Sequence, residues 1–224
     1  MNRHARCAVM LALLAVFAAG TAGCQGLAYV LVRTVGPFIP EDEHKAEYDL
    51  SGRSVVVLVD LKDPTVASEF PRLELSLADA IGKVLAESKA CGPVVPARSV
   101  EAARRTERGF ARWPVARVGE YFNVDRVIHV ELFEFRIKDS PESNAFRGYA
   151  EAAIRIVSPE SDQQVWPMLA AARILRAETL PDTDADSEEA ARQEQILVEG
   201  FGEKIAKQFC TYKLSERPIR PKVR

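Results

Sequence analysis

Few residues of this chain could do chemistry, and the first candidate is a histidine beside a carboxylate. His129-Val130-Glu131 is an H-x-E pattern, which needs a downstream P-C-x-x-C pair to complete a catalytic zinc site. The only cysteine after it is Cys210, so the sequence offers no third ligand. We therefore predict no metal site and expect His129 to lie in a strand, with its ring near Glu131 on the same face.

A run of aspartates is the second candidate metal site. Residues 182–186 (DTDAD) begin like a calcium-binding loop. Counted from Asp182, the sixth position is Ser187 instead of glycine and the twelfth is Gln193 instead of glutamate, and both changes damage such a site. We interpret the run as a solvated loop that places negative charge at the N-terminus of the following helix.

The chain lacks the common motifs for nucleophilic catalysis and for phosphate or dinucleotide binding. G-x-S-x-G, G-x-x-x-x-G-K-[ST] and G-x-G-x-x-G are all missing. Of the three histidines, His4 and His44 precede the expected domain, so a histidine-activated nucleophile is hard to build. The sequence predicts a non-enzymatic protein without metal or cofactor, and it leaves a two-carboxylate hydrolase of the envelope as an alternative.

The N-terminus has the pattern of a secretion signal. Arg3 and Arg6 precede an uninterrupted apolar run over residues 8–19. A transmembrane helix needs about 20 apolar residues, so this run is too short to span a bilayer. Small residues follow it, as signal-peptidase processing requires.

The signal ends in Thr21-Ala22-Gly23-Cys24, which resembles the bacterial lipobox. That resemblance implies cleavage between Gly23 and Cys24, acylation of Cys24 with palmitate-type chains, and stable anchoring in a bilayer. An ordinary secretion signal, cut elsewhere, is the alternative. Gln25, instead of an aspartate, follows the cysteine, and by resemblance to enterobacterial lipoprotein sorting this implies the outer membrane.

Two further cysteines, Cys91 and Cys210, belong to the expected domain. Both fall at the C-terminal ends of predicted long helices, and disulfides persist in exported proteins. A bridge between them requires Cα atoms within roughly 7 Å of each other, so a disulfide and two buried thiols both remain open.

The apolar pattern predicts an α/β domain that would position these residues. We divide the chain into a signal peptide (1–23), a lipidated tether (24–50), a domain (51–212) and a basic tail (213–224). The run SVVVLV at 54–59 is typical of a strand buried on both faces. The expected elements are strands at 54–59, 93–95, 126–138, 145–158 and 164–176, and helices at 69–88, 99–105, 114–122 and 187–211.

These elements have the order β-α-β-α-α-β-β-β-α, a mixed sheet of about five strands with helices packed on it. A change of apolar parity near Leu132 predicts a β-bulge. In the last strand, alternation places Trp166, Met168 and Ile174 inward. Because proline cannot donate to a ladder, Trp166-Pro167 predicts an edge strand where a partner could dock.

A family resemblance rests on the VVVLVD-type first strand, on the helix that follows it, and on Val124-Asp125-Arg126-Val127-Ile128. These features resemble the TolB N-terminal and CsgG-like group, which includes the lipoprotein LpoB. The resemblance implies a small α/β domain on a lipidated stem and a periplasmic, partner-binding role.

Composition agrees with a folded domain and excludes one class of function. Hydrophobic residues make up 47% and charged residues 28% of the 224 positions, and the net charge is −2. Nucleic-acid binding through bulk positive charge is therefore excluded. We expect an accessory lipoprotein that binds a protein of the cell envelope, with a subunit of an oligomeric export or transport assembly as the alternative.

Overall fold

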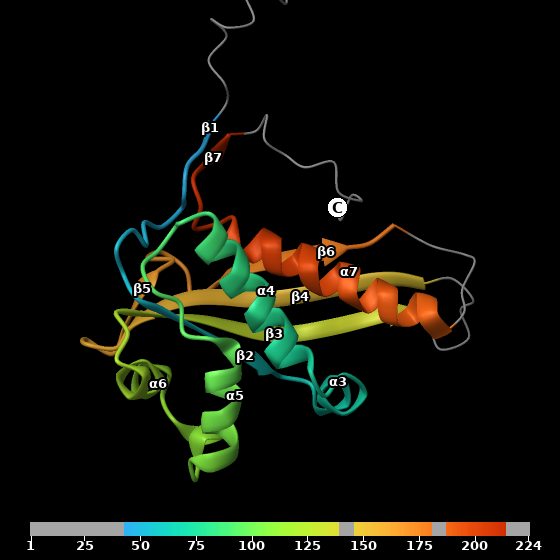
Figure 1. The fold of residues 1–224 in the computed structure, drawn as a ribbon, viewed down its shortest axis with the longest axis horizontal. Helices are drawn as coiled ribbons and strands as arrows, with labels where there is room; N and C mark the ends of the chain where they lie inside the picture. Colours follow the sequence, from blue (N-terminus) through green and yellow to red (C-terminus); the bar gives the residue numbers. More distant parts are fainter. Residues whose placement is uncertain (1–42, 139–145, 181–186, 214–224) are drawn as a thin grey trace, which may run out of the picture. The chain divides into compact units, whose positions relative to one another are not determined.

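The computed structural model describes residues 43–138, 146–180 and 187–213, and a five-stranded mixed sheet lies at their centre (Figure 1). β2 pairs with β3 in parallel, and β4 pairs antiparallel with β3, β5 and β6. The predicted mixed α/β sheet is confirmed. The strands are β2 (Val55–Leu61), β3 (Arg126–Lys138), β4 (Phe146–Ser158), β5 (Gln163–Trp166) and β6 (Arg173–Glu178).

Helices cover both faces of the sheet (Figure 1). α4 (Leu73–Glu87) and α7 (Ser187–Ala206) lie side by side over one face. α5 (Ala97–Thr106), the short helix η2 (Phe110–Arg112) and α6 (Val115–Phe122) lie over the other. The strand β2 is therefore buried on both faces, as its unbroken β-branched run predicted.

The larger core lies between the sheet and the α4–α7 pair. Leu77 and Ile81 of α4 and Phe201 of α7 are almost fully buried in it. The two helices approach closely at Gly202, where an added Cβ would lie 2.7 Å from the Cβ of Ala80. A larger residue at position 202 would therefore push α7 away from α4.

Two predictions about the long antiparallel strands are confirmed. The register between β3 and β4 shifts between Leu132 and Glu134, which is the expected bulge. The spacing of the apolar residues in 145–158 also predicts one face directed into the core, and Ala150, Ile154 and Ile156 of β4 are fully buried.

The prediction of a single strand over 164–176 is wrong in two respects, because the strand is interrupted and other residues face the core. The chain leaves the sheet after Trp166 and returns to it at Arg173, so β5 and β6 are separate strands along the same side of β4. Met168 is 87% exposed and Ile174 is 46% exposed, although both were expected inside. Leu175 and Ala177 occupy the core-facing positions of β6 instead.

The predicted helix at 69–88 corresponds to α4, which begins later, at Leu73, and a separate short helix that the sequence did not predict precedes it. Asp63 caps α3 (Pro64–Glu69) by accepting a hydrogen bond from the Thr65 amide, and Pro64 suits the first turn. Pro71 disfavours helical geometry at the residue before it, so α3 ends there and α4 starts anew.

Two shorter corrections concern the predicted strand at 93–95 and the end of the last helix. Residues 93–95 contribute only an isolated bridge between Val94 and Val55. α7 ends at Ala206 instead of residue 211. Beyond it, β7 (Tyr212–Lys213) pairs with β1 (Glu43–His44).

Candidate functional site

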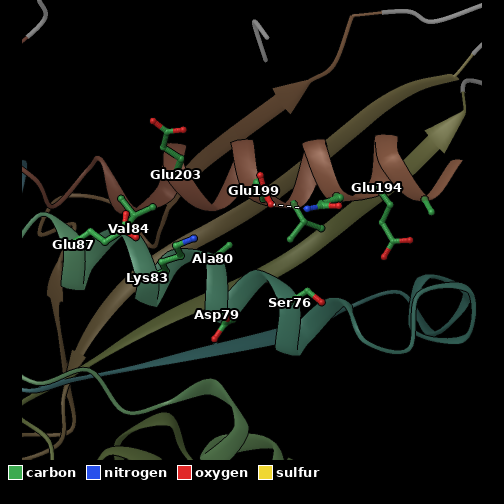
Figure 2. A pocket seen from close by; sticks show the side chains of 12 residues that line it. Ser76, Asp79, Ala80, Lys83, Val84, Glu87, Glu194, Glu199 and Glu203 are labelled. Carbon is green, nitrogen blue, oxygen red and sulfur yellow. Dashed lines mark hydrogen bonds between the residues drawn. The ribbon is translucent and has the colours of Figure 1, made fainter. Parts of the chain in front are cut away.

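A groove with a volume of about 580 Å³ lies between α4 and α7 (Figure 2). Its apolar lining comes from Ala80, Val84 and Val198. Lys83 extends from α4 toward α7, and Glu194 extends from α7 toward α4 (Figure 2). The carboxylates along the groove outnumber this one lysine, and they are Asp79, Glu87, Glu194, Glu199 and Glu203.

The groove's carboxylates differ in how far they are neutralised. Glu203 pairs with Lys207 at 2.6 Å, and Glu199 accepts a hydrogen bond from Gln195 at 2.9 Å. Among the described residues, Asp79, Glu87 and Glu194 have no ion-pair partner. Burial raises the pKa of Glu194. The groove is thus a negatively charged surface that could receive a cationic group.

A second polar cluster surrounds His129, whose side chain is buried between strands. Its Nδ1 accepts a hydrogen bond from Arg155 Nε at 3.0 Å, because arginine can only donate. Nε2 then carries the proton and donates to Asp60 Oδ2 at 2.7 Å. The expected neighbour, Glu131, instead pairs with Lys62 Nζ at 2.7 Å. Both ring nitrogens are therefore engaged, and His129 offers no free base.

Asp60 is the centre of this cluster. Burial would raise its pKa, but hydrogen bonds from His129 and from Arg104 outweigh burial and lower the pKa to about 2. Arg104 Nη2 lies 2.8 Å from Asp60 Oδ1 and the guanidinium also approaches Glu74. The charges of this cluster are neutralised within the domain, so it links β2, β3, β4 and α5 as a structural network.

The remaining predicted site residues fall partly outside the described chain. Gly23, Cys24 and residues 182–186 lie outside it, so cleavage, acylation and the solvated-loop interpretation stay predictions. Within the described ranges, no group of three or more His, Cys, Asp or Glu side chains could hold a metal ion.

Trp166 ends β5, and Pro167 follows it. Among the described strands β5 pairs with β4 alone, so it lies at an edge of the sheet. The Trp166 ring is buried and meets Phe209 edge-on, with ring centroids 5.2 Å apart. A partner at this edge would meet the exposed residues after Pro167 and not the tryptophan. The docking itself stays a prediction.

Comparison with known proteins gives a likeness of fold only. No protein-family model and no curated protein match the sequence. Three solved structures illustrate the likeness. The lipoprotein GNA1162 from Neisseria meningitidis is 16% identical over 68% of this chain and 97% of its own, with a TM-score of 0.42. A PelC dodecamer from Paraburkholderia phytofirmans is 10% identical over 75% and 97%, with a TM-score of 0.43.

A DUF330-family protein from Xanthomonas campestris is 9% identical over 71% of this chain and 84% of its own, with a TM-score of 0.46. Identities and TM-scores this low transfer neither a function nor a partner. The resemblance to the TolB N-terminal and CsgG-like group stays a prediction.

Cys91 and Cys210 carry free thiols, and each lies four residues beyond the end of its helix, α4 or α7. Burial raises the pKa of both thiols, and the nearby Cys210 raises that of Cys91 further. Cys210 Sγ lies 3.0 Å from Ser88 Oγ, which directly follows α4.

We expect mild oxidation to join these two thiols, because α4 packs against α7 and Cys210 contacts Ser88, which is three residues from Cys91 in sequence. Tryptic mass mapping should then recover residues 90–98 linked to residues 208–213, and the free energy of unfolding should rise by about 2–4 kcal/mol. Cys210→Ser is the matched control that cannot form the link. Two thiols that still react with maleimide in the oxidised, denatured protein would exclude the bridge.

Proposed function

We propose that this protein is a non-enzymatic lipoprotein, anchored through Cys24 on the periplasmic side of the outer membrane, which binds a protein of the cell envelope. The observation that carries the binding role is the contrast between the two polar regions. Around His129 the buried charges neutralise one another, whereas the α4–α7 groove keeps Asp79, Glu87 and Glu194 without ion pairs among the described residues. Unneutralised charge beside apolar surface suits recognition of a basic segment of a partner.

The anchor rests on the sequence. Thr21-Ala22-Gly23-Cys24 has the residue types of a lipobox, directly after a run too short to span a bilayer. In the described part of the chain, no helix combines the length and the apolar character needed to cross a membrane. A lipid on Cys24 would supply the attachment that such a chain needs.

Cross-linking in intact cells followed by affinity purification of the full-length lipoprotein tests this function. We expect an envelope protein to be recovered with the native chain and lost with Cys24→Ser, which cannot be acylated. Glu194→Lys should reduce recovery about tenfold, the change that a loss of about 1.4 kcal/mol produces. The matched control is Glu120→Lys, which reverses an exposed charge on α6 away from the groove.

Three other outcomes would refute parts of the proposal. Equal recovery with Glu194→Lys and with the native chain would exclude the groove as the binding surface. Recovery of the same chain alone would favour the oligomeric assembly, and hydrolysis of an envelope polymer by the purified protein would refute the non-enzymatic role.

A further inference from the structure

The loop between β5 and β6 carries an exposed apolar surface. Residues 167–172 have the sequence PMLAAA and contain no polar side chain. Met168 is 87% exposed and Leu169 is fully exposed, more than any other large hydrophobic residue described. Exposure of two adjacent large apolar side chains is unfavourable in water and marks a contact surface.

The shape of this loop is fixed by the residues at its base. Gln164 Nε2 donates to the carbonyl oxygens of Pro167 at 2.7 Å and Ala170 at 2.8 Å. Trp166 holds the start of the loop in the core, and β6 continues from its end along β4. Met168 and Leu169 are thus presented outward by an organised turn.

The hydrogen bonds from Gln164 to the carbonyl oxygens of Pro167 and Ala170 are relevant to what could cover the loop. A hydrocarbon environment offers no hydrogen-bond donors, so a backbone carbonyl that enters it must already be paired. Gln164 provides this pairing for Pro167 and Ala170 from within the domain.

The position of the loop relative to the chain's N-terminal segment gives the second argument. Arg173, directly after the loop, pairs with Glu47 at 3.2 Å. Only 22 residues separate Glu47 from Cys24, so an anchored Cys24 keeps the loop within about 80 Å of the bilayer even with the intervening chain fully extended. A tethered surface meets its target at a high effective concentration.

We infer that the loop at 167–172 inserts Met168 and Leu169 into the hydrocarbon boundary of the bilayer that holds Cys24, as a second, non-covalent membrane contact. This inference rests on the lipid anchor of the proposed function. The insertion orients the domain on the membrane, which a flexible lipid attachment alone does not do.

Photolabelling of the mature lipoprotein in vesicles tests the insertion. The vesicles contain phosphatidylethanolamine, phosphatidylglycerol and a phospholipid with a diazirine on its acyl chain. After illumination and trypsin digestion, we expect about ten times as many lipid adducts on the peptide of residues 156–173 as on the peptide of residues 118–126. The second peptide is the reference, because it carries Tyr121, an exposed aromatic residue of α6.

The double variant Met168→Gln with Leu169→Gln should lose these adducts and remain folded, because both side chains are exposed. Leu180→Gln, which changes an apolar side chain that is 53% exposed elsewhere on the surface, is the matched control and should keep them. Vesicle-bound protein without adducts on residues 156–173 would overturn the insertion and leave the anchor intact. Protein that does not associate with vesicles at all would instead refute the anchor.

A second experiment distinguishes a lipid from a protein as the molecule that covers the loop at 167–172. A photoreactive phenylalanine analogue at position 169 of the lipoprotein in native membranes should yield a phospholipid adduct. A cross-link to an envelope protein or to a second copy of the chain, with no lipid adduct, would overturn the inference.

Discussion

Replacing Phe201 by alanine is expected to lower the free energy of unfolding by about 3–5 kcal/mol. The Phe201 side chain is fully buried in the larger core, so its removal leaves a cavity under α7. Because a domain of this size has a total of about 5–15 kcal/mol, the loss removes a large fraction of the stability.

Urea denaturation followed by far-ultraviolet circular dichroism measures this loss. Phe133→Ala is the matched control, since the Phe133 side chain is 43% exposed and its removal should change the free energy of unfolding by less than about 1 kcal/mol. Equal losses for the two variants would mean that α7 does not lie over the sheet as described.

The second large effect is expected at Asp60. Breaking a buried ion pair by removing one partner costs about 3–5 kcal/mol. The Asp60 side chain is 34% exposed, so we expect Asp60→Ala to lower the free energy of unfolding by about 2–3 kcal/mol. The loss arises because the Nε2 proton of His129 and the Arg104 guanidinium then lack their acceptor.

The same residue predicts a dependence of stability on pH. The folded protein holds the pKa of Asp60 at about 2, below its ordinary value of 3.8. The unfolded chain therefore takes up the proton first as the pH falls, and the stability that Asp60 contributes is complete above about pH 4 and lost toward about pH 2.

Chemical denaturation at several pH values across this window checks the assignment. Asp60→Ala should flatten the slope of unfolding free energy against pH, and Asp79→Ala, which removes a carboxylate of the groove, should retain it. An unchanged slope in Asp60→Ala would show that other carboxylates carry the acid sensitivity.

The sequence predicted elements well where local pattern and tertiary packing agree. The run at 54–59 has a single consistent interpretation, because β-branched residues buried on both faces suit a parallel strand that helices cover on both sides. The final helix begins at Ser187 as predicted, but the apolar spacing through Phe209 suggested too long a helix. A turn after α7 buries Phe209 and places its ring edge-on against the Trp166 ring.

The failures occur where a contact distant in sequence decides the outcome. Glu131, the predicted neighbour of His129, is two residues away in sequence, whereas the observed hydrogen-bond partner, Asp60, belongs to the adjacent strand β2. Met168 was placed inside because alternation was extended across Pro167, although a proline cannot donate to a ladder and β5 ends directly before it. The α4–α7 groove was likewise missed, since it needs the relative placement of two helices.

The pairing of β1 with β7 determines how mechanical load would reach this domain. A pull on the N-terminal segment acts first on the two residue pairs of that ladder and on the hydrogen bond from the Glu47 amide to the Gln208 carbonyl. These contacts are few, and they lie outside the five-stranded sheet. Under tension they would break in succession, while the sheet and its helices keep their fold.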